Sequence, residues 1–337
     1  MKTFSFLAAF FATAFSSTAA LTLEDISPHF PINAQIVWQA PTNHLPKSFW
    51  IYKRLPPHPF SALVISNAMI LASLQTNGIP KPSTNDFYIW SDGNACGMRF
   101  SVFSITPASA TISFSPGQDH STSNVPHDDV LVKRAWVYAN QFGVDSKQVE
   151  LQEMTTQFNQ DENGNDLADQ ICGRGVFLSR LLDGISFSNY GDNGGNGGFW
   201  IEFGSNGKIR AFSLVWPDLR RDALQPTASP QEIIACIRAF KTLMLPNHQE
   251  TDYFQRLKSF ANVKKLTVTK ITPYYMEGFY GTTPTNITPP QIIAPFAELK
   301  AVADFGNSNA TVKLLAPILS SEISRLSKAS VQPEQMR

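Results

Sequence analysis

The chain has 337 residues, and 43% of them are hydrophobic. That share is enough to bury a substantial core and excludes wholesale disorder. Lysine and arginine together number 27, as do aspartate and glutamate, so the composition lacks the basic excess of nucleic-acid-binding proteins and no nucleic-acid partner is expected.

The first twenty residues are arranged like a secretory signal peptide. Lys2 supplies a positive charge, Phe4 to Phe15 form a mainly apolar run, and small residues follow up to Ala20. Such a run is too short to span a bilayer, so a retained membrane anchor is the less favoured alternative. We therefore expect cleavage after Ala20 and a soluble, secreted, extracellular protein that has no contact with a membrane after cleavage.

The N-terminal third is predicted to contain one helix and three strands. Residues 21–60 are rich in proline and carry only short apolar pieces. The first helix is expected to run from the N-cap Ser61 to about Thr76, where apolar residues recur with helical spacing. Strand-like runs follow at residues 87–90, 98–105 and 111–114.

The central part repeats this order. Asp128 and Asp129 suit the start of a second helix, and Gly143 is a natural end for it. Strand-like runs at 149–158 and 176–187 flank a polar insert. The clearest hairpin of the chain joins strands 199–203 and 209–215, because the link Ser205-Asn206-Gly207-Lys208 contains Asn-Gly, the strongest short hairpin signal.

The C-terminal part opens with the best helix start of the sequence. Ser229-Pro230-Gln231-Glu232 combines an N-cap, a proline at the first helical position and the acid of a capping box. This third helix is expected to reach about Leu245. Strand-like runs at 263–275, 296–305 and 311–319 complete the chain.

A helix followed by three or four strands thus occurs three times, beginning near residues 61, 128 and 229. We therefore predict an α+β fold in which helices pack on antiparallel sheets, with this unit recurring about three times. The expected organisation is a signal peptide at 1–20, an N-terminal unit at 21–125, a central unit at 126–225, a C-terminal unit at 226–320 and a flexible tail at 321–337.

Cysteines and sequons supply the expected covalent features of an exported protein. Cys236 lies on an apolar helical pattern and is expected to be buried. Cys96 and Cys172 each lie beside glycine in polar surroundings, and their disulfide is the preferred pairing among those that three cysteines allow. Asn309 and Asn286 each begin an N-glycosylation sequon, and Asn309 is the better candidate because Pro289 follows the other.

Catalytic signatures are missing from the sequence. It contains no G-x-S-x-G elbow, no H-E-x-x-H and no nucleotide-binding glycine motif. A glycosidase needs only two carboxylates, and Glu202 and Asp218 are candidates. The same hairpin carries Trp200 and Trp216, which could stack on a sugar, although packing of both in the core is the simpler interpretation.

Two polar segments contain potential metal ligands. The insert at 159–170 matches only the start of an EF-hand loop, because Gln170 occupies the position of the bidentate glutamate. A second group is dense in potential ligands but lacks the fixed spacing of a metal motif: Asp119, His120, His127, Asp128 and Asp129. A solvated loop and helix capping explain both segments, and no metal and no cofactor is expected.

The motif Arg180-Leu-Leu-Asp183-Gly184-Ile185, followed by Asn206-Gly207-Lys208-Ile209, resembles extracytoplasmic PepSY-like regulatory modules over roughly residues 174–221. The resemblance extends to related regulators of cell-wall sensor kinases, and the run from Gly191 to Gly198 departs from their pattern. It implies a helix-plus-antiparallel-sheet domain that binds or inhibits partners instead of catalysing.

From these features we expect a secreted protein with a non-catalytic binding or regulatory role, whose partner is an extracellular protein or a glycan. Two alternatives stay open. One is a secreted hydrolase acting on a polysaccharide or ester, which would show two facing carboxylates or a Ser-His pair. The other is a small-ligand-binding protein with an apolar cavity, lined by Phe and Trp, between sheet and helices.

Overall fold

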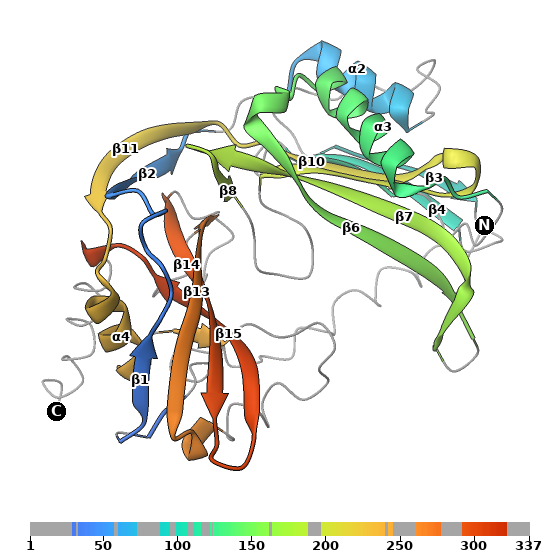
Figure 1. The fold of residues 1–337 in the computed structure, drawn as a ribbon. Helices are drawn as coiled ribbons and strands as arrows, with labels where there is room; N and C mark the ends of the chain where they lie inside the picture. The colour runs from blue at the N-terminus through green and yellow to red at the C-terminus, as the bar shows by residue number, and fades with distance from the viewer. Residues whose placement is uncertain are drawn as a thin grey trace, which may run out of the picture.

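The computed structural model describes residues 29–31, 33–56, 60–72, 88–94, 99–106, 111–115, 122, 124–161, 164–187, 197–239, 242–244, 260–277 and 292–321. These residues form one fifteen-stranded sheet with three α-helices beside it (Figure 1). None of the helices in this part of the chain combines the length and apolar character that crossing a membrane would need.

The helices are α2 (Ala62–Leu71), α3 (Asp128–Gln141) and α4 (Pro230–Arg238). The strands are β1 (Gln35–Trp38), β2 (Ser48–Arg54), β3 (Tyr88–Asn94), β4 (Arg99–Thr106), β5 (Thr111–Ser115), β6 (Val149–Gln160), β7 (Asp166–Leu182), β8 (Ile185–Phe187), β9 (Gly198–Phe203), β10 (Ile209–Val215), β11 (Leu219–Pro226), β12 (Leu243–Met244), β13 (Lys265–Glu277), β14 (Ile292–Asp304) and β15 (Asn309–Pro317).

One part of the sheet, called the α3 half below, contains β3 to β7, β9 and β10, and helices α2 and α3 cover one of its faces (Figure 1). Strand β9 shows why the helices lie on that face. Phe199, Ile201 and Phe203 alternate along it and are fully buried in the core beneath the helices. The ring of Phe142, just after α3, packs against Phe199 at a centroid distance of 5.3 Å.

The other part, called the α4 half, contains β1 and β12 to β15. Its core combines the inner faces of β13, β14 and β15 with helix α4. Ile233, Cys236 and Ile237 form the buried side of α4, which confirms the predicted burial of Cys236. Here β1 pairs with β13 in parallel, whereas β13–β14 and β14–β15 are antiparallel.

The two halves meet at β8, which pairs with β7 of the α3 half and with β13 of the α4 half, while β2 pairs with β14 and β11. A small cluster of Tyr52, Leu182, Phe187, Tyr275 and Ile293 is buried at this junction. The Tyr52 hydroxyl donates a hydrogen bond to Asp183 Oδ2 at 2.6 Å, and the Tyr275 hydroxyl donates to the Trp50 carbonyl at 2.9 Å. Side-chain hydrogen bonds therefore tie β2 to both halves.

Several predicted elements are confirmed. Ser61 accepts a hydrogen bond from Val64 N and caps α2. Helix α3 begins at Asp128, and Gly143 adopts the left-handed conformation just after it. The capping box of α4 forms as the sequence indicates, with Ser229 and Glu232 bonding each other's main chain.

The predicted fold class is wrong. The described chain is mainly β, and its strands belong to one mixed sheet instead of three separate helix-plus-strands units. Helices α2 and α3 share one core on one part of the sheet. The recurrence in the sequence fails because it reflects element order alone, whereas strands far apart in the chain, such as β1 and β13, pair with each other.

Helix α4 is also shorter than expected. It ends at Arg238 with Ala239 as its C-cap, and Leu243 and Met244 form strand β12. These two residues pair with Leu315 and Leu314 of β15. Their apolar character fits a helix and a strand equally well, so pairing with a distant strand decides between them.

Candidate functional site

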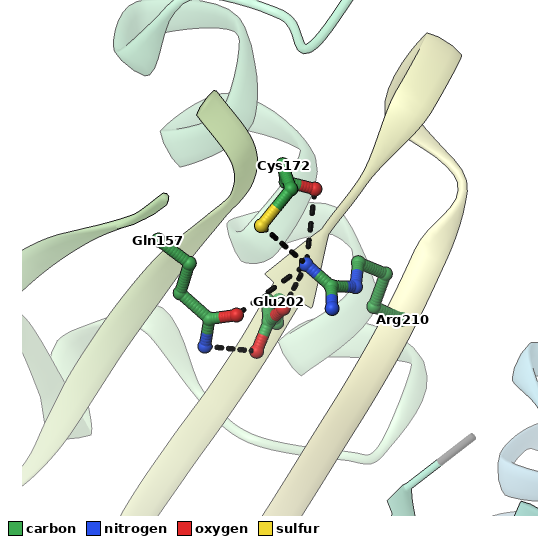
Figure 2. Close-up of polar contacts among 4 residues, drawn as sticks. All are labelled: Gln157, Cys172, Glu202 and Arg210. Carbon is green, nitrogen blue, oxygen red and sulfur yellow. Dashed lines mark hydrogen bonds and ion pairs between the residues drawn. The ribbon is translucent and has the colours of Figure 1, made fainter. Parts of the chain in front are cut away.

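The face of the α3 half that is opposite the helices carries a buried polar network (Figure 2). Glu202 of β9 and Arg210 of β10 form an ion pair with 3.1 Å between Oε1 and Nη1. Gln157 of β6 donates from Nε2 to Glu202 Oε2 at 2.8 Å. Both carboxylate oxygens of Glu202 are therefore engaged within the protein.

Alternation along the strands puts these side chains on one face. In β9 the odd-numbered residues from 199 to 203 point to the helices, so Trp200 and Glu202 point away from them. Gly173 of β7 and Gln157 of β6 are opposite each other in register. The same face thus receives one network residue from each of three strands, β6, β9 and β10.

Gly173 provides the space that the network occupies. A Cβ atom at this position would lie 2.6 Å from Arg210 Nη1 and 2.8 Å from Glu202 Oε1. Because Gly173 has no side chain, both groups lie directly over the main chain of β7. There Arg210 Nη1 also donates a hydrogen bond to the Cys172 carbonyl at 3.0 Å. Cys172 is buried, and its Sγ is 3.6 Å from the same nitrogen.

Burial and charge act in opposite directions on Glu202. Its exposed fraction is only 4%, and desolvation raises the pKa of its carboxyl, while Arg210 and the hydrogen bond from Gln157 lower it. Desolvation is the largest of these effects, so the pKa of Glu202 is raised overall. Arg210 compensates the buried charge, and removing either partner of such a pair leaves the other uncompensated in a poorly solvated place.

The aromatic side chains on this face lie close to the sheet. Trp200 Nε1 would be 3.0 Å from a Cβ on Gly175, and the Phe177 ring would be 2.9 Å from a Cβ on Gly198. Phe177 and Trp200 are opposite each other in register and are half-buried. Trp200 therefore does not join the core under the helices, whereas Trp216 packs against that core.

The structure does not bring Glu202 and Asp218 together as a pair of catalytic carboxylates. Glu202 is opposite Ala211 in the β9–β10 ladder. Asp218 follows the end of β10 and is seven residues beyond Ala211, which corresponds to roughly 20 Å of extended chain.

The small-ligand alternative also lacks support, because Phe142 lies against Phe212 with 5.7 Å between the ring centres, and phenylalanine rings occupy the layer between sheet and helices.

The acids considered for metal binding serve local structure. Asp128 forms an ion pair with Arg174 of β7 at 2.5 Å. In the insert, Asp161 accepts hydrogen bonds from the main chain and side chain of Asn165, both at 2.9 Å, and these bonds fix the β6–β7 turn. His127 is the N-cap residue of α3. Asp119 and His120 lie outside the described residues.

The covalent sites stay predictions. Asn309 is exposed and is the first residue of β15. Among the described residues Cys172 forms no disulfide, and its predicted partner Cys96 lies outside them, as do Asn286 and the cleavage site at Ala20.

The charged residues of the R-x-x-D-G motif lie at the junction of the two halves. Arg180 Nη1 donates to the Pro217 carbonyl at 2.6 Å, and its guanidinium stacks 4.4 Å from the centre of the Trp216 ring. Burial lowers the pKa of Arg180 to about 10. Asp183 has a positive φ of 53° in the β7–β8 turn and forms an ion pair with Arg221.

Gln157 and Arg210 are the network residues that the sequence analysis missed. A usable signal existed for Arg210. The Asn206-Gly207 turn fixes the register of the hairpin, in which Ala211 is opposite Glu202, so Arg210 lies one residue away from that position. No comparable local signal existed for Gln157, because β6 reaches β9 only through β7.

Comparison with solved structures finds distant likenesses between this chain and two Bacillus proteins. One is the YpeB C-terminal domain of Bacillus megaterium, which is 12% identical, with 76% of this chain and 92% of that chain covered and a TM-score of 0.31. Another is YycH from Bacillus subtilis, which is 11% identical, with 66% and 44% covered and a TM-score of 0.29. These matches confirm the resemblance, and at such TM-scores we infer nothing more from them.

No protein family and no curated protein matches the sequence.

Proposed function

We propose that this chain is a secreted, extracellular protein with a non-catalytic binding or regulatory role. The observation that supports this most is the engagement of Glu202. One of its oxygens faces Arg210 and the other accepts from Gln157, while the side chain is 4% exposed. A general acid, base or nucleophile must reach its substrate. Glu202 would have to abandon both partners to do so.

The proposed partner is an extracellular protein. The other class considered, a glycan, is usually held by aromatic rings that expose a flat side. Trp200 and Phe177 lie beside Gly175 and Gly198 and are half-buried, so part of their surface is covered by the protein itself. The strand edges and the exposed polar side chains of the sheet favour contact with another polypeptide.

Binding and catalysis can be separated with one set of variants. The mature chain is tested against generic glycan, ester and peptide substrates, together with Glu202→Gln, Asp218→Asn and the exposed control Asp169→Asn. We expect no turnover in any of them. A hydrolytic activity that falls at least about tenfold in Glu202→Gln or Asp218→Asn and persists in the control would overturn the proposal.

Partner binding is tested with the mature chain immobilised on a biosensor and exposed to proteins from the extracellular medium of the source cells. A protein that is captured is identified, purified and titrated against the immobilised chain. We expect saturable binding of defined stoichiometry. If the captured material is polysaccharide, and its binding is lost in Trp200→Ala, the partner class proposed here is wrong.

A further inference from the structure

Strand β6 forms an edge of the sheet. It pairs with β7 and with no other described strand, and in Figure 1 it borders the α3 half. Natural edge strands are commonly short or carry lysine or proline, which discourage the addition of a further strand. β6 is twelve residues long, and its sequence VELQEMTTQFNQ contains no lysine, arginine or proline.

Bulges limit the part of β6 that another strand could use. The register with β7 shifts between Leu151 and Glu153, and again after Gln157. Between these points Glu153–Gln157 pairs with β7 without interruption, over a length of about 16 Å. Because bulges disrupt regular pairing, this five-residue stretch is the place where a strand can be added.

The direction of the main-chain groups in this stretch follows from the β7–β9 ladder. Arg180 N donates to the Gly197 carbonyl at 2.8 Å, so the main chain of Arg180 points to β9. Hydrogen-bonded and non-hydrogen-bonded positions alternate along an antiparallel pair. Gly173, Gly175 and Phe177, at odd distances from Arg180, therefore direct their N–H and C=O groups to β6.

These three residues are opposite Gln157, Thr155 and Glu153 of β6. The main chains of those β6 residues consequently point to β7. The residues between them, Met154 and Thr156, direct their N–H and C=O groups away from the sheet. The edge thus presents four main-chain groups at the spacing of a β-ladder, and no described strand pairs with them.

The side chains beside this edge differ between the two faces of the sheet. Glu150 and Glu153 are exposed and lie on the face opposite the helices, in register with Ser179 and Phe177. On the helix face, Leu151 is 43% exposed and Met154 is partly buried against the core. Around Glu153 one face of the edge is therefore acidic, and the other carries the apolar Leu151 and Met154, followed by the exposed Thr156.

We propose that the Glu153–Gln157 edge of β6 accepts an extended segment of the partner protein as an additional strand. In that segment basic residues alternate with aliphatic ones, because successive side chains of a strand point to opposite faces. Within the regular stretch a basic side chain meets Glu153 and an aliphatic one meets Met154, while Glu150 and Leu151 extend the same two faces beyond the bulge. A second copy of β6 is disfavoured because it would add its own glutamates to this face. The proposal rests on the non-catalytic binding function proposed above.

The test uses a synthetic peptide, acetyl-Lys-Val-Lys-Val-Lys-Val-Lys-amide, titrated against the mature chain. Thr156→Pro removes an outward N–H without removing a bond to β7, so the fold should tolerate it. Glu153→Lys reverses one charge and leaves the main chain unchanged. We expect each variant to weaken peptide binding by about tenfold, whereas the charge-matched control Asp169→Lys, also exposed, should change it less than about twofold.

Several results would overturn the proposal. They are absence of peptide binding at millimolar concentration, equal binding by the wild type and Thr156→Pro, equal losses in Glu153→Lys and Asp169→Lys, and tight binding of the corresponding Glu-Val peptide. If ultracentrifugation shows a dimer that Thr156→Pro dissociates, a second copy occupies the edge and the proposal is also wrong. A captured partner that binds Thr156→Pro and wild type alike contradicts this edge but leaves the binding function intact, whereas hydrolytic turnover contradicts the function itself.

Discussion

Tyr52 is the residue whose chemistry depends most clearly on the join between the two halves of the sheet. Its side chain is 7% exposed, and its hydroxyl donates to Asp183. Burial, followed by the hydrogen bond to Asp183, raises the pKa of Tyr52 to about 12. The folded protein therefore keeps this hydroxyl protonated at pH values where an unfolded chain ionises it, near pH 10.

This difference predicts a loss of stability in alkali. The contribution of Tyr52 is fully present below pH 10 and is lost as pH rises from 10 through 12, because only the unfolded state ionises in that window. Tyr52→Phe should be less stable at pH 8 by about 1 kcal/mol, since it lacks the hydrogen bond. Its deficit relative to wild type should shrink between pH 10 and 12 in denaturant titrations. A deficit that stays constant over this window would contradict the assignment.

Among the elements, the β9–β10 hairpin shows how far local sequence can be trusted. Asn206 and Gly207 have φ values of 55° and 67°, and Lys208 N donates to the Ser205 carbonyl at 3.1 Å. Two consecutive positive φ angles are the requirement of the tight hairpin turn that Asn-Gly predicts. Here the sequence prediction is confirmed down to the turn residues.

Gly207 supports a quantitative test of this element. A Cβ at this position would lie 2.1 Å from Arg134 Nη1 and would also impose a left-handed conformation on a side-chain-bearing residue. Gly207→Ala should lower the free energy of unfolding by about 1–2 kcal/mol or more. Asn206→Gly, at the neighbouring positive φ, should change it by less than about 0.5 kcal/mol. Equal effects in urea titrations of both variants would show that the turn geometry is different.

Elements that depend on distant partners were harder to predict. Trp50 lies in β2, within the proline-rich segment 21–60 for which no strand was predicted, and β2 is stabilised by pairing with β11 and β14. Strand β11 was missed as well, because the alternation of Leu219 to Pro226 is weak and exposed. The candidate site has the same limit. Glu202 and Arg210 are near each other through a local turn, but Gln157 and Gly173 come from other strands.

At the scale of the whole molecule, the sheet is continuous but its hydrophobic interior is not. Among the described residues the cores of the α3 half and the α4 half are separate, and a small cluster around Tyr52 and Tyr275 lies between them. The β8–β13 pairing amounts to one registered pair, Tyr275 with Phe187. Cooperation between the halves therefore depends on the side chains that gather around Asp183.

Asp183 joins the β7–β8 turn to β2 through Tyr52 and to β11 through Arg221. Asp183→Gly removes these contacts without backbone strain, because glycine accepts the positive φ at this position. We expect wild type to unfold in one calorimetric transition, and Asp183→Gly to unfold in two transitions or with a van't Hoff enthalpy clearly below the calorimetric one. The control Asp222→Ala breaks the more exposed Lys53–Asp222 pair on β2 and β11, which should change stability by less than about 1 kcal/mol and leave a single transition. A single, fully cooperative transition in Asp183→Gly would mean that the β-ladders alone couple the two cores.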